Sequence, residues 1–256
     1  SLELPGHQLR LLQEVVKSGK PVVLVLVNGR PLSVNWADKH VPAIVEAWYP
    51  GSQGGKALAD ILFGDYNPGG KLTVTFPRTV GQIPFNFPHK PSSQVDGGNK
   101  TGLTGNMSRV NGALYPFGYG LSYTTFKYSD LTFSSEKITP EQSLVVCTGS
   151  KAGDEVVQLY IRDVQSSVTT YEKNLRGFER VHLKPGESKE ISFMVTPADL
   201  ELLNLKNDWV VESGEFKVMI GASSEDIRLE KPFMVLPYNE LNIQKKVIPN
   251  EALLPI

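Results

Sequence analysis

Residues 41–77 most strongly limit what this chain can fold into. They read VPAIVEAWYPGSQGGKALADILFGDYNPGGKLTVTFP. The apolar run at residues 43–47 is typical of a strand covered on both faces. Residues 56–63 carry apolar side chains at helical spacing, and Gly64 follows where a helix C-terminal glycine belongs. Because a turn then leads to an apolar stretch at residues 72–76, the pattern predicts a βαβ unit that needs helices on both faces of its sheet.

The residues before this unit predict more of the same layer. Residues 6–18 have a helical stripe of apolar side chains, and residues 21–27 form an apolar, β-branched run typical of a central parallel strand. Asn28 and Arg30 follow at the strand's C-terminal end, where ligand crevices form in open α/β sheets. The alternative interpretation is a turn at Asn28 and a solvated or acid-paired Arg30. We expect residues 1–88 to form an α/β sandwich piece, a mostly parallel sheet flanked by helices.

Residues 89–123 change character. They are rich in Gly, Pro, Asn and Ser, and their middle lacks periodicity. A long stretch of this kind within a compact protein is usually functional or mobile. It ends in an aromatic and glycine-rich cluster at residues 114–123, which suits either a sugar platform or a packed interdomain joint; the joint is the favoured interpretation.

From residue 124 the apolar period becomes two. About seven short alternating segments, separated by turns, predict an antiparallel β-sandwich over residues 124–237. The fibronectin type III-like version is favoured because no Cys–Trp–Cys pattern is present. The fold class is therefore α/β plus all-β. The tail at residues 238–256 is apolar at scattered positions and is expected to lie along another surface.

Charge, length and cysteine content exclude several classes. A net charge of -1 argues against a nucleic-acid partner. No apolar run reaches membrane-spanning length. A single cysteine, Cys147, excludes an internal disulfide and is expected to pack as a small hydrophobic residue. Since the chain opens at Ser1 without an initiator Met or signal peptide, we expect a fragment or processed chain, whose missing targeting signals say nothing about location.

Motif searches find no catalytic centre. Residues 51–56 resemble a phosphate loop but lack its first glycine and its Ser/Thr, and no G-x-S-x-G is present. The four histidines lack metal-ligand spacing, so no metal and no cofactor are expected. Asp60, Asp65, Asp154 or Glu155 could each be half of a carboxylate pair for glycoside hydrolysis. Each is more simply a solvated or capping charge.

Several ordered segments carry a family resemblance. They are SLELPG at residues 1–6, VLVLVNGRP at 23–31, AWYPG at 47–51, ADILFGDYNPGGK at 59–71, GALYPFGYGLSYTTF at 112–126 and AGDEVVQLY at 152–160. Over residues 1–236 the chain resembles the C-terminal portion of a glycoside hydrolase family 3 enzyme of the bacterial periplasmic β-glucosidase type.

The resemblance implies an exo-acting retaining β-glycosidase that removes terminal β-linked sugars from oligosaccharides, located in the periplasm or outside the cell. Such enzymes have an N-terminal (β/α)8 barrel with an Asp nucleophile, and a Glu acid/base that would stand a few residues before residues 1–6. Neither is in this chain. Because retention needs two carboxyl groups about 5 Å apart, we expect the chain alone to be inactive, with the barrel as its partner; a homodimer is compatible with the resemblance.

The resemblance also implies two substrate-binding residues. Arg109 and Tyr115 match positions that reach over the barrel mouth, and we expect them to form part of the +1 subsite. The segments after Arg109 and at residues 144–149 are shorter than the family's pattern. The alternative function is a non-catalytic carbohydrate-binding or structural module. A large exposed apolar patch at Leu2, Trp48 and Tyr49 would indicate a missing partner domain, whereas their burial would favour this alternative.

Overall fold

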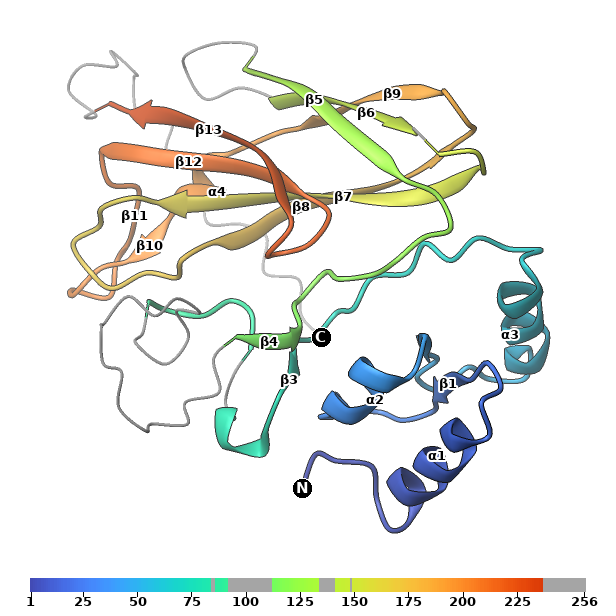
Figure 1. The fold of residues 1–256 in the computed structure, drawn as a ribbon. Coiled ribbons are helices and arrows are strands. Elements are labelled where there is room, and N and C mark those ends of the chain that lie inside the picture. Colours follow the sequence, from blue (N-terminus) through green and yellow to red (C-terminus); the bar gives the residue numbers. More distant parts are fainter. Residues whose placement is uncertain (84–85, 92–111, 134–140, 148, 237–256) are drawn as a thin grey trace, which may run out of the picture.

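The computed structural model describes residues 1–83, 86–91, 112–133, 141–147 and 149–236, without the side chains of 141–147. A small α/β module lies against a larger β-sandwich, and the chain passes from one to the other through residues 112–126 (Figure 1). The predictions for residues 92–111, including Arg109, and for the tail at 238–256 lie outside the described residues. Within the described part, no helix is long and apolar enough to cross a membrane.

The α/β module contains a short parallel sheet with three helices. β1 and β2 pair in parallel from Val23↔Ala43 to Leu26↔Glu46, and α2 connects them. The chain order is α1 (Gln8–Lys17), β1 (Val23–Leu26), α2 (Asn35–His40), β2 (Ala43–Glu46) and α3 (Gly54–Phe63). The sequence thus predicted both parallel strands and the helices α1 and α3.

Gly64 ends α3 as its position in the sequence predicted. Its backbone is left-handed, with φ 84°, and its N–H donates to the Ile61 carbonyl. A residue with a Cβ would be strained there, which is why glycine stops the helix at this point.

The second strand of the βαβ unit does not form as the sequence predicted. Only Phe76–Pro77 form a strand, β3, and it pairs antiparallel with β4 (Ala113–Tyr115) instead of joining β1 and β2. The reason is visible at Leu72, whose N–H donates to the Tyr119 carbonyl at 2.8 Å and whose carbonyl accepts from the Gly118 N–H at 2.7 Å. Because the aromatic segment uses these backbone groups, they cannot extend the parallel sheet.

The expectation that residues 21–27 form a central parallel strand is wrong for the described part of the chain. The sheet has two strands among the described residues. Val23 and Val27, at either end of β1, are exposed together with Leu11 and Val15 of α1. The apolar run predicted a buried strand because it could not indicate whether covering layers lie within the same chain.

The β-sandwich has seven main strands, as the period of two predicted. One sheet has the order β13-β12-β7-β8 and the other β5-β6-β9, and all neighbours are antiparallel. The strands are β5 (Phe126–Phe133), β6 (Glu141–Cys147), β7 (Gly153–Asp163), β8 (Asn174–Leu183), β9 (Ser188–Phe193), β12 (Gly214–Gly221) and β13 (Ile227–Val235). The prediction that the Cys147 side chain packs as a hydrophobic residue stays untested, because that side chain is not described.

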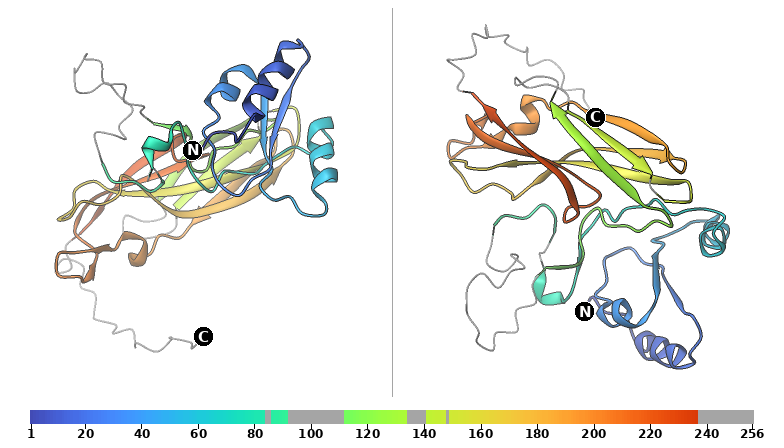
Figure 2. Two further views of the ribbon diagram at one scale, coloured as in Figure 1. Left: turned by 90° about the horizontal axis from the view of Figure 1, so that it is seen from below. Right: turned by 45° about the horizontal axis from the view of Figure 1, so that its top comes forward.

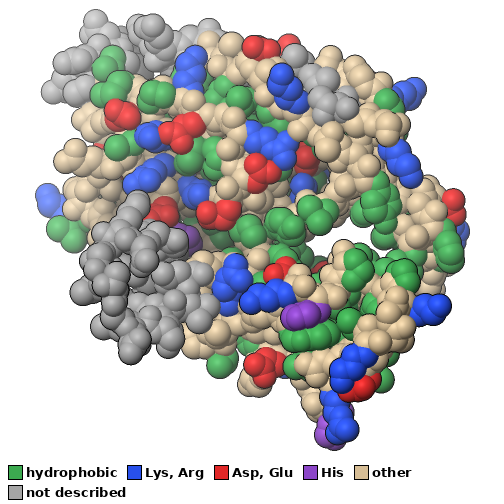
Figure 3. All heavy atoms as spheres, viewed as in Figure 1, with side chains coloured by type: hydrophobic (Ala, Val, Ile, Leu, Met, Phe, Trp, Pro, Cys, Tyr) green, Lys and Arg blue, Asp and Glu red, His purple; other side chains and the backbone are tan. Residues whose placement is uncertain are grey.

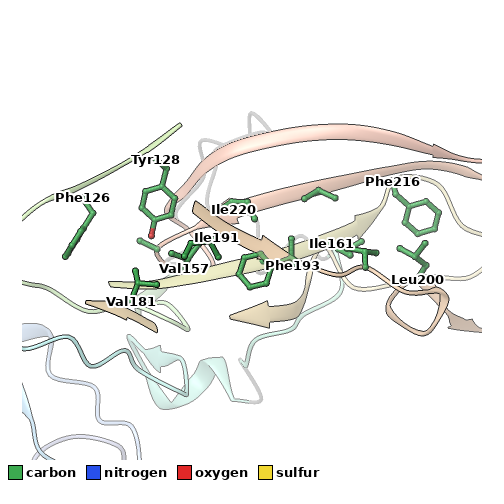
Figure 4. Packing of buried hydrophobic residues seen from close by; sticks show 14 of the residues in the cluster. Phe126, Tyr128, Val157, Ile161, Val181, Ile191, Phe193, Leu200, Phe216 and Ile220 are labelled. Atoms are coloured by element: carbon green, nitrogen blue, oxygen red, sulfur yellow. The ribbon is translucent and has the colours of Figure 1, made fainter. Parts of the chain in front are cut away.

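Alternating residues of both sheets point inward and fill the sandwich. Figure 4 shows Phe126 and Tyr128 from one sheet against Val157, Ile161 and Ile220 from the other. Val157 and Ile220 have no exposed surface. Burying such side chains contributes roughly 1.5–3 kcal/mol each, so this core dominates the stability of the sandwich.

The cluster at residues 114–123 forms the joint between the modules, as the favoured interpretation predicted. Phe117 stacks on Phe87 with ring centroids 4.7 Å apart, and the Phe117 carbonyl accepts from the Ser224 N–H at 2.9 Å. The Gly118 carbonyl accepts from Gln158 Nε2 at 3.2 Å. Gly118 has φ 79°, and a Cβ there would overlap the Gln158 side chain, so only glycine lets the two modules approach this closely.

Two polar side chains of the α/β module complete the joint. Asn67 donates to the Ala152 carbonyl and accepts from the Ser122 hydroxyl and the Tyr123 N–H, at 2.8–3.0 Å. Lys71 pairs with Glu155 of β7 at 2.9 Å. Figure 3 shows hydrophobic side chains along both sides of the seam where the modules meet. The modules are therefore held by packing and by specific polar contacts.

Candidate functional site

Tyr115 is the predicted site residue that the structure describes. It lies on β4, where its hydroxyl donates to Asp38 Oδ1 of α2 at 2.8 Å. Its ring stacks on Tyr119 with centroids 5.4 Å apart and an interplanar angle of 12°. Burial, and then the hydrogen bond to Asp38 and its negative charge, raise the pKa of Tyr115 above its ordinary value. The hydroxyl therefore stays protonated and holds Asp38.

A network of hydrogen bonds brings four segments together around Tyr115. The Ser33 N–H donates to the Leu2 carbonyl at 2.8 Å, and the Ser33 hydroxyl donates to the Pro77 carbonyl at 3.0 Å. Asn35 Nδ2 donates to the Arg78 carbonyl at 2.6 Å. These contacts fix the N-terminal segment, the start of α2 and the end of β3 relative to one another, next to the strand that carries Tyr115.

We call Asp38, Arg78, Tyr115 and Tyr119 the Tyr115 site. It combines a carboxylate on the surface, a guanidinium whose charge acts on Tyr115, and two stacked phenol rings. A carboxylate and a guanidinium can respectively accept and donate hydrogen bonds to hydroxyl groups. Asp38 was missed from the sequence, because a single acid in a six-residue helix carries no signal that it will meet Tyr115, 77 positions along the chain.

Tyr115 is less open than the resemblance suggested. One face of its ring is covered by Tyr119, and its hydroxyl is already engaged with Asp38. Arg109 lies outside the described residues, so whether the two residues meet is not tested. What this site can offer directly is the Asp38 carboxylate, with Tyr115 as its support.

Asn28 follows the turn interpretation. Its Nδ2 donates to the Glu46 carboxylate at 3.2 Å and its Oδ1 accepts from the Arg30 N–H at 3.1 Å. Desolvation raises the pKa of Glu46, although hydrogen bonds from Trp48 and Asn28 oppose the shift. Arg30 is exposed and makes no ion pair with any described residue. Hydrogen bonds of Asn28 thus link the turn after β1 to the C-terminal end of β2.

Of the acids considered from the sequence, Asp60 and Asp65 are surface charges as the simpler interpretation predicted, whereas Asp154 and Glu155 are mostly buried and paired. Asp60 pairs with Lys56 on the surface of α3 at 2.6 Å, and Asp65 is exposed. Glu155 pairs with Lys71 in the joint. Asp154 accepts from Arg180, from His182 at 2.7 Å and from the Tyr66 hydroxyl at 3.2 Å. Burial alone would raise the pKa of Asp154, but these donors lower it below its ordinary value.

The charge of Glu212 acts on the Asp163 carboxyl group in the sandwich. Burial raises the pKa of Asp163, and the charge of Glu212 raises it further, against a hydrogen bond from the Gln165 N–H. Glu212 accepts from both the N–H and the hydroxyl of Ser167. Since both acids are engaged with the loop after β7, they close that loop. No group of three or more metal-ligating side chains occurs in the described ranges.

The three residues proposed to distinguish a partnered from a self-sufficient module behave differently from one another. Trp48 is half-buried, with its ring 6.0 Å from Phe76 in the α/β core, and Leu2 is half-buried. Tyr49 is exposed and lies over Gly29. The three residues therefore form neither a shared exposed patch nor a buried group. The exposed apolar surface lies instead on α1, β1 and the end of α3.

Two family models match the chain. Residues 1–123 match the glycosyl hydrolase family 3 C-terminal domain, and residues 155–224 match a fibronectin type III-like domain. The chain carries a family 3 C-terminal domain. The Tyr115 site is built entirely from residues within the family 3 match.

Relatives and solved structures agree with this assignment. A β-xylosidase of Formosa agariphila is 44% identical over 229 residues, which are 88% of this chain and 31% of the relative. A periplasmic β-glucosidase of Salmonella typhimurium is 42% identical over 235 residues, 89% of this chain and 31% of the relative. The structure of a Listeria innocua β-glucosidase in complex with glucose superimposes with a TM-score of 0.85 at 35% identity, covering 93% of this chain and 34% of that one. The chain spans about a third of the length of these family 3 relatives.

Proposed function

We propose that this chain is part of an exo-acting retaining β-glycosidase, similar to β-glucosidases and β-xylosidases, that removes terminal β-linked sugars from oligosaccharides. The chain supplies the scaffold and one wall of the pocket on the aglycone side. A barrel, as another part of the same enzyme, supplies the attacking carboxylate. Periplasmic or extracellular location and assembly as a homodimer belong to the same proposal, as do the domain limits at residues 88, 123 and 237.

The observation that carries this proposal is the exposed apolar surface of the α/β module. Leu11 and Val15 of α1, Val23 of β1, and Phe63 at the end of α3 are all exposed. Large apolar side chains exposed on several elements of one module are typical of an interaction site, and a parallel sheet normally has both faces covered. Relatives about three times as long contain further polypeptide. We propose that a corresponding layer of the same enzyme covers this surface.

The site residues fit the edge of such a pocket. Leu2 lies beside Ser33 and Pro77, in the same network as β4. By the resemblance the acid/base precedes Leu2 by a few residues, and we propose that it lies near the Tyr115 site. We propose that Tyr115, with Arg109, contributes to the +1 subsite. The hydrogen bond from Tyr115 to Asp38 supports a role in which Tyr115 orients the Asp38 carboxylate to accept hydrogen bonds from sugar hydroxyls.

The test compares two proteins on nitrophenyl β-glucoside and β-xyloside. The 256-residue chain should show no turnover, whereas the chain fused to a family 3 barrel, or its own longer form, should hydrolyse one of the substrates with retention. In the active protein, Tyr115→Ala should raise KM for a disaccharide while turnover of the aryl glycoside changes little. Tyr171→Ala, an exposed tyrosine of the sandwich, is the matched control. Turnover by the purified chain itself would refute the proposal.

The second candidate is a non-catalytic carbohydrate-binding or structural module. The packing of half-buried Trp48 against Phe76 favours it, because that contact is made within this chain. This alternative predicts that the chain folds cooperatively and remains monomeric by itself, and that no longer form has hydrolytic activity. Activity of the longer form therefore separates the two candidates.

A further inference from the structure

A hairpin in the sandwich presents an exposed tryptophan. β10 (Leu202–Leu203) and β11 (Trp209–Val210) pair antiparallel, with Leu203 directly opposite Trp209. Because successive strand residues point to opposite faces, Leu202 is buried, while Leu203 and Trp209 lie side by side on the outer face. Trp209 is 68% exposed, and Leu205 in the turn is 87% exposed. We call Leu203, Leu205 and Trp209 the Trp209 strip.

The turn of this hairpin is held in one conformation. Asn204 Oδ1 accepts from the Lys206 N–H at 2.8 Å and from the Asp208 N–H at 3.0 Å. The Asn204 N–H donates to the Asp208 carbonyl at 3.0 Å, and the left-handed Asn207, with φ 61°, closes the turn. Buried Leu200 anchors the preceding helix α4 (Pro197–Leu200) in the sandwich core. The indole is thus displayed on a rigid support, which lowers the entropy lost when a ligand binds.

We propose that the Trp209 strip binds polysaccharide chains, and that these are β-linked, the one part of the inference that rests on the proposed function. A pyranose ring has an apolar C–H face that matches an exposed indole, and hydroxyl groups around its rim that need hydrogen-bonding partners. Here the indole is next to the turn that carries Lys206, Asn207 and Asp208, which are all exposed and supply donors and acceptors. The combination of a flat apolar face and adjacent polar groups fits an amphipathic ring.

The size of the strip favours a sugar over a protein. Three exposed side chains offer roughly half of the ~800 Å² per partner that a stable protein interface buries. One or two sugar rings are of matching size. The turn between the strip's residues carries charges of both signs, Lys206 and Asp208, which interrupt its apolar surface.

The strip is separate from the Tyr115 site. The hairpin lies at the end of the sandwich opposite α3, on the other side of the molecule from the α/β helices (Figures 1 and 2). Binding there would hold the protein on a polymer without occupying the Tyr115 site. This inference therefore goes beyond the proposed function and does not depend on hydrolysis.

Affinity electrophoresis of the 256-residue chain tests the inference. Native gels contain soluble xylan, mixed-linkage β-glucan or, as an α-linked comparison, dextran. We expect slower migration in at least one β-linked polysaccharide and none in dextran, with a dissociation constant about tenfold weaker for Trp209→Ala. Phe178→Ala is the matched control, because Phe178 is an aromatic residue of the same sandwich with 67% exposure. Both residues are exposed, so both variants should keep the melting temperature of the parent.

The outcomes are distinct. Retardation that Trp209→Ala removes and Phe178→Ala keeps supports the inference, as does a shift of tryptophan emission on adding xylohexaose that is lost in Trp209→Ala. No retardation in either β-linked polysaccharide, or equal retardation of both variants, overturns it. If Trp209→Ala instead converts a dimer to a monomer in size-exclusion chromatography, the strip binds a second copy and the inference is wrong. None of these experiments measures hydrolysis, so their results neither support nor refute the proposed glycosidase function.

Discussion

Replacing Lys71 by methionine removes one partner of the ion pair that joins the two modules. The side chains of Lys71 and Glu155 are only 14% and 5% exposed, and the pair measures 2.9 Å. Methionine keeps most of the volume and the apolar stem of lysine, so the change isolates the charge. The Glu155 carboxylate keeps its hydrogen bond from the Val156 N–H at 2.8 Å but loses its ion-pair partner, and only the more distant charge of Arg228 still acts on it.

The expected loss follows from the burial of the remaining acid. Breaking a buried pair by removing one partner destabilises a protein by about 3–5 kcal/mol, because it leaves an uncompensated charge in the interior. For a chain of this size that is roughly a 10 °C fall in melting temperature. The surface pair of Lys217 and Glu230, at 2.6 Å, provides the matched control. Both of its side chains are more than a third exposed, so Lys217→Met should cost only about 0–1 kcal/mol.

The measurement is urea unfolding followed by far-UV circular dichroism and by tryptophan fluorescence. Trp36 and Trp48 report on the α/β module, and Trp209 reports on the sandwich. Glu155→Gln in the Lys71→Met background removes the orphaned charge, so the double variant should be more stable than Lys71→Met alone. A Lys71→Met loss below about 1 kcal/mol, or a double variant that loses the sum of both single changes, would refute the reasoning.

Three further predictions follow from described contacts. Tyr115→Phe should lower the free energy of unfolding by roughly 1 kcal/mol, because it removes the hydrogen bond to Asp38. Tyr119→Phe removes a hydroxyl from the other ring of the same stack and should change the free energy of unfolding little. Equal losses for the two variants in chemical denaturation would contradict this. Asn67→Ala should cost about 2–3 kcal/mol by urea unfolding, since three joint hydrogen bonds disappear, and a loss under about 1 kcal/mol would count against the joint as described. The raised folded-state pKa of Asp163 means that its contribution to stability is complete below its unfolded pKa of about 3.9 and is lost as pH rises through the folded value. The melting temperature of Asp163→Asn relative to the parent should therefore increase between pH 3 and pH 7, and a difference that stays constant or falls would show that the shift is absent.

Local signals in the sequence predicted local structure well. Gly64 stops α3 because its left-handed backbone is a property of that one position. The alternating strands of the sandwich were predictable because each has one face toward a core formed within this chain. The stretch at residues 72–76 was not, because its apolar residues are equally compatible with a parallel strand. Its actual pairing with Tyr119 and with β4 depends on contacts more than 35 positions away.

In the candidate site, too, features with a local sequence signal were predictable and features that depend on long-range contacts were not. The resemblance indicated Tyr115, and the aromatic cluster was correctly interpreted as a joint at Phe117 and Gly118. Asp38 could not be found, because its role depends on where α2 lies relative to β4 and no local pattern encodes that position. Whether Trp48 is exposed was left open by the sequence; it is half-buried against Phe76, in a turn after β2 where its φ is 49°.

The two-stranded sheet of β1 and β2 has a practical consequence for anyone who produces this chain. Neither strand has a further hydrogen-bonding neighbour among the described residues, so each leaves backbone donors and acceptors that can template the addition of a foreign strand. The exposed Val23 and Val27 would stabilise an added strand by apolar contact. We expect the chain to aggregate in a concentration-dependent way when expressed alone, and co-expression with polypeptide that covers β1 to be a more effective remedy than changes to the surface of the sandwich.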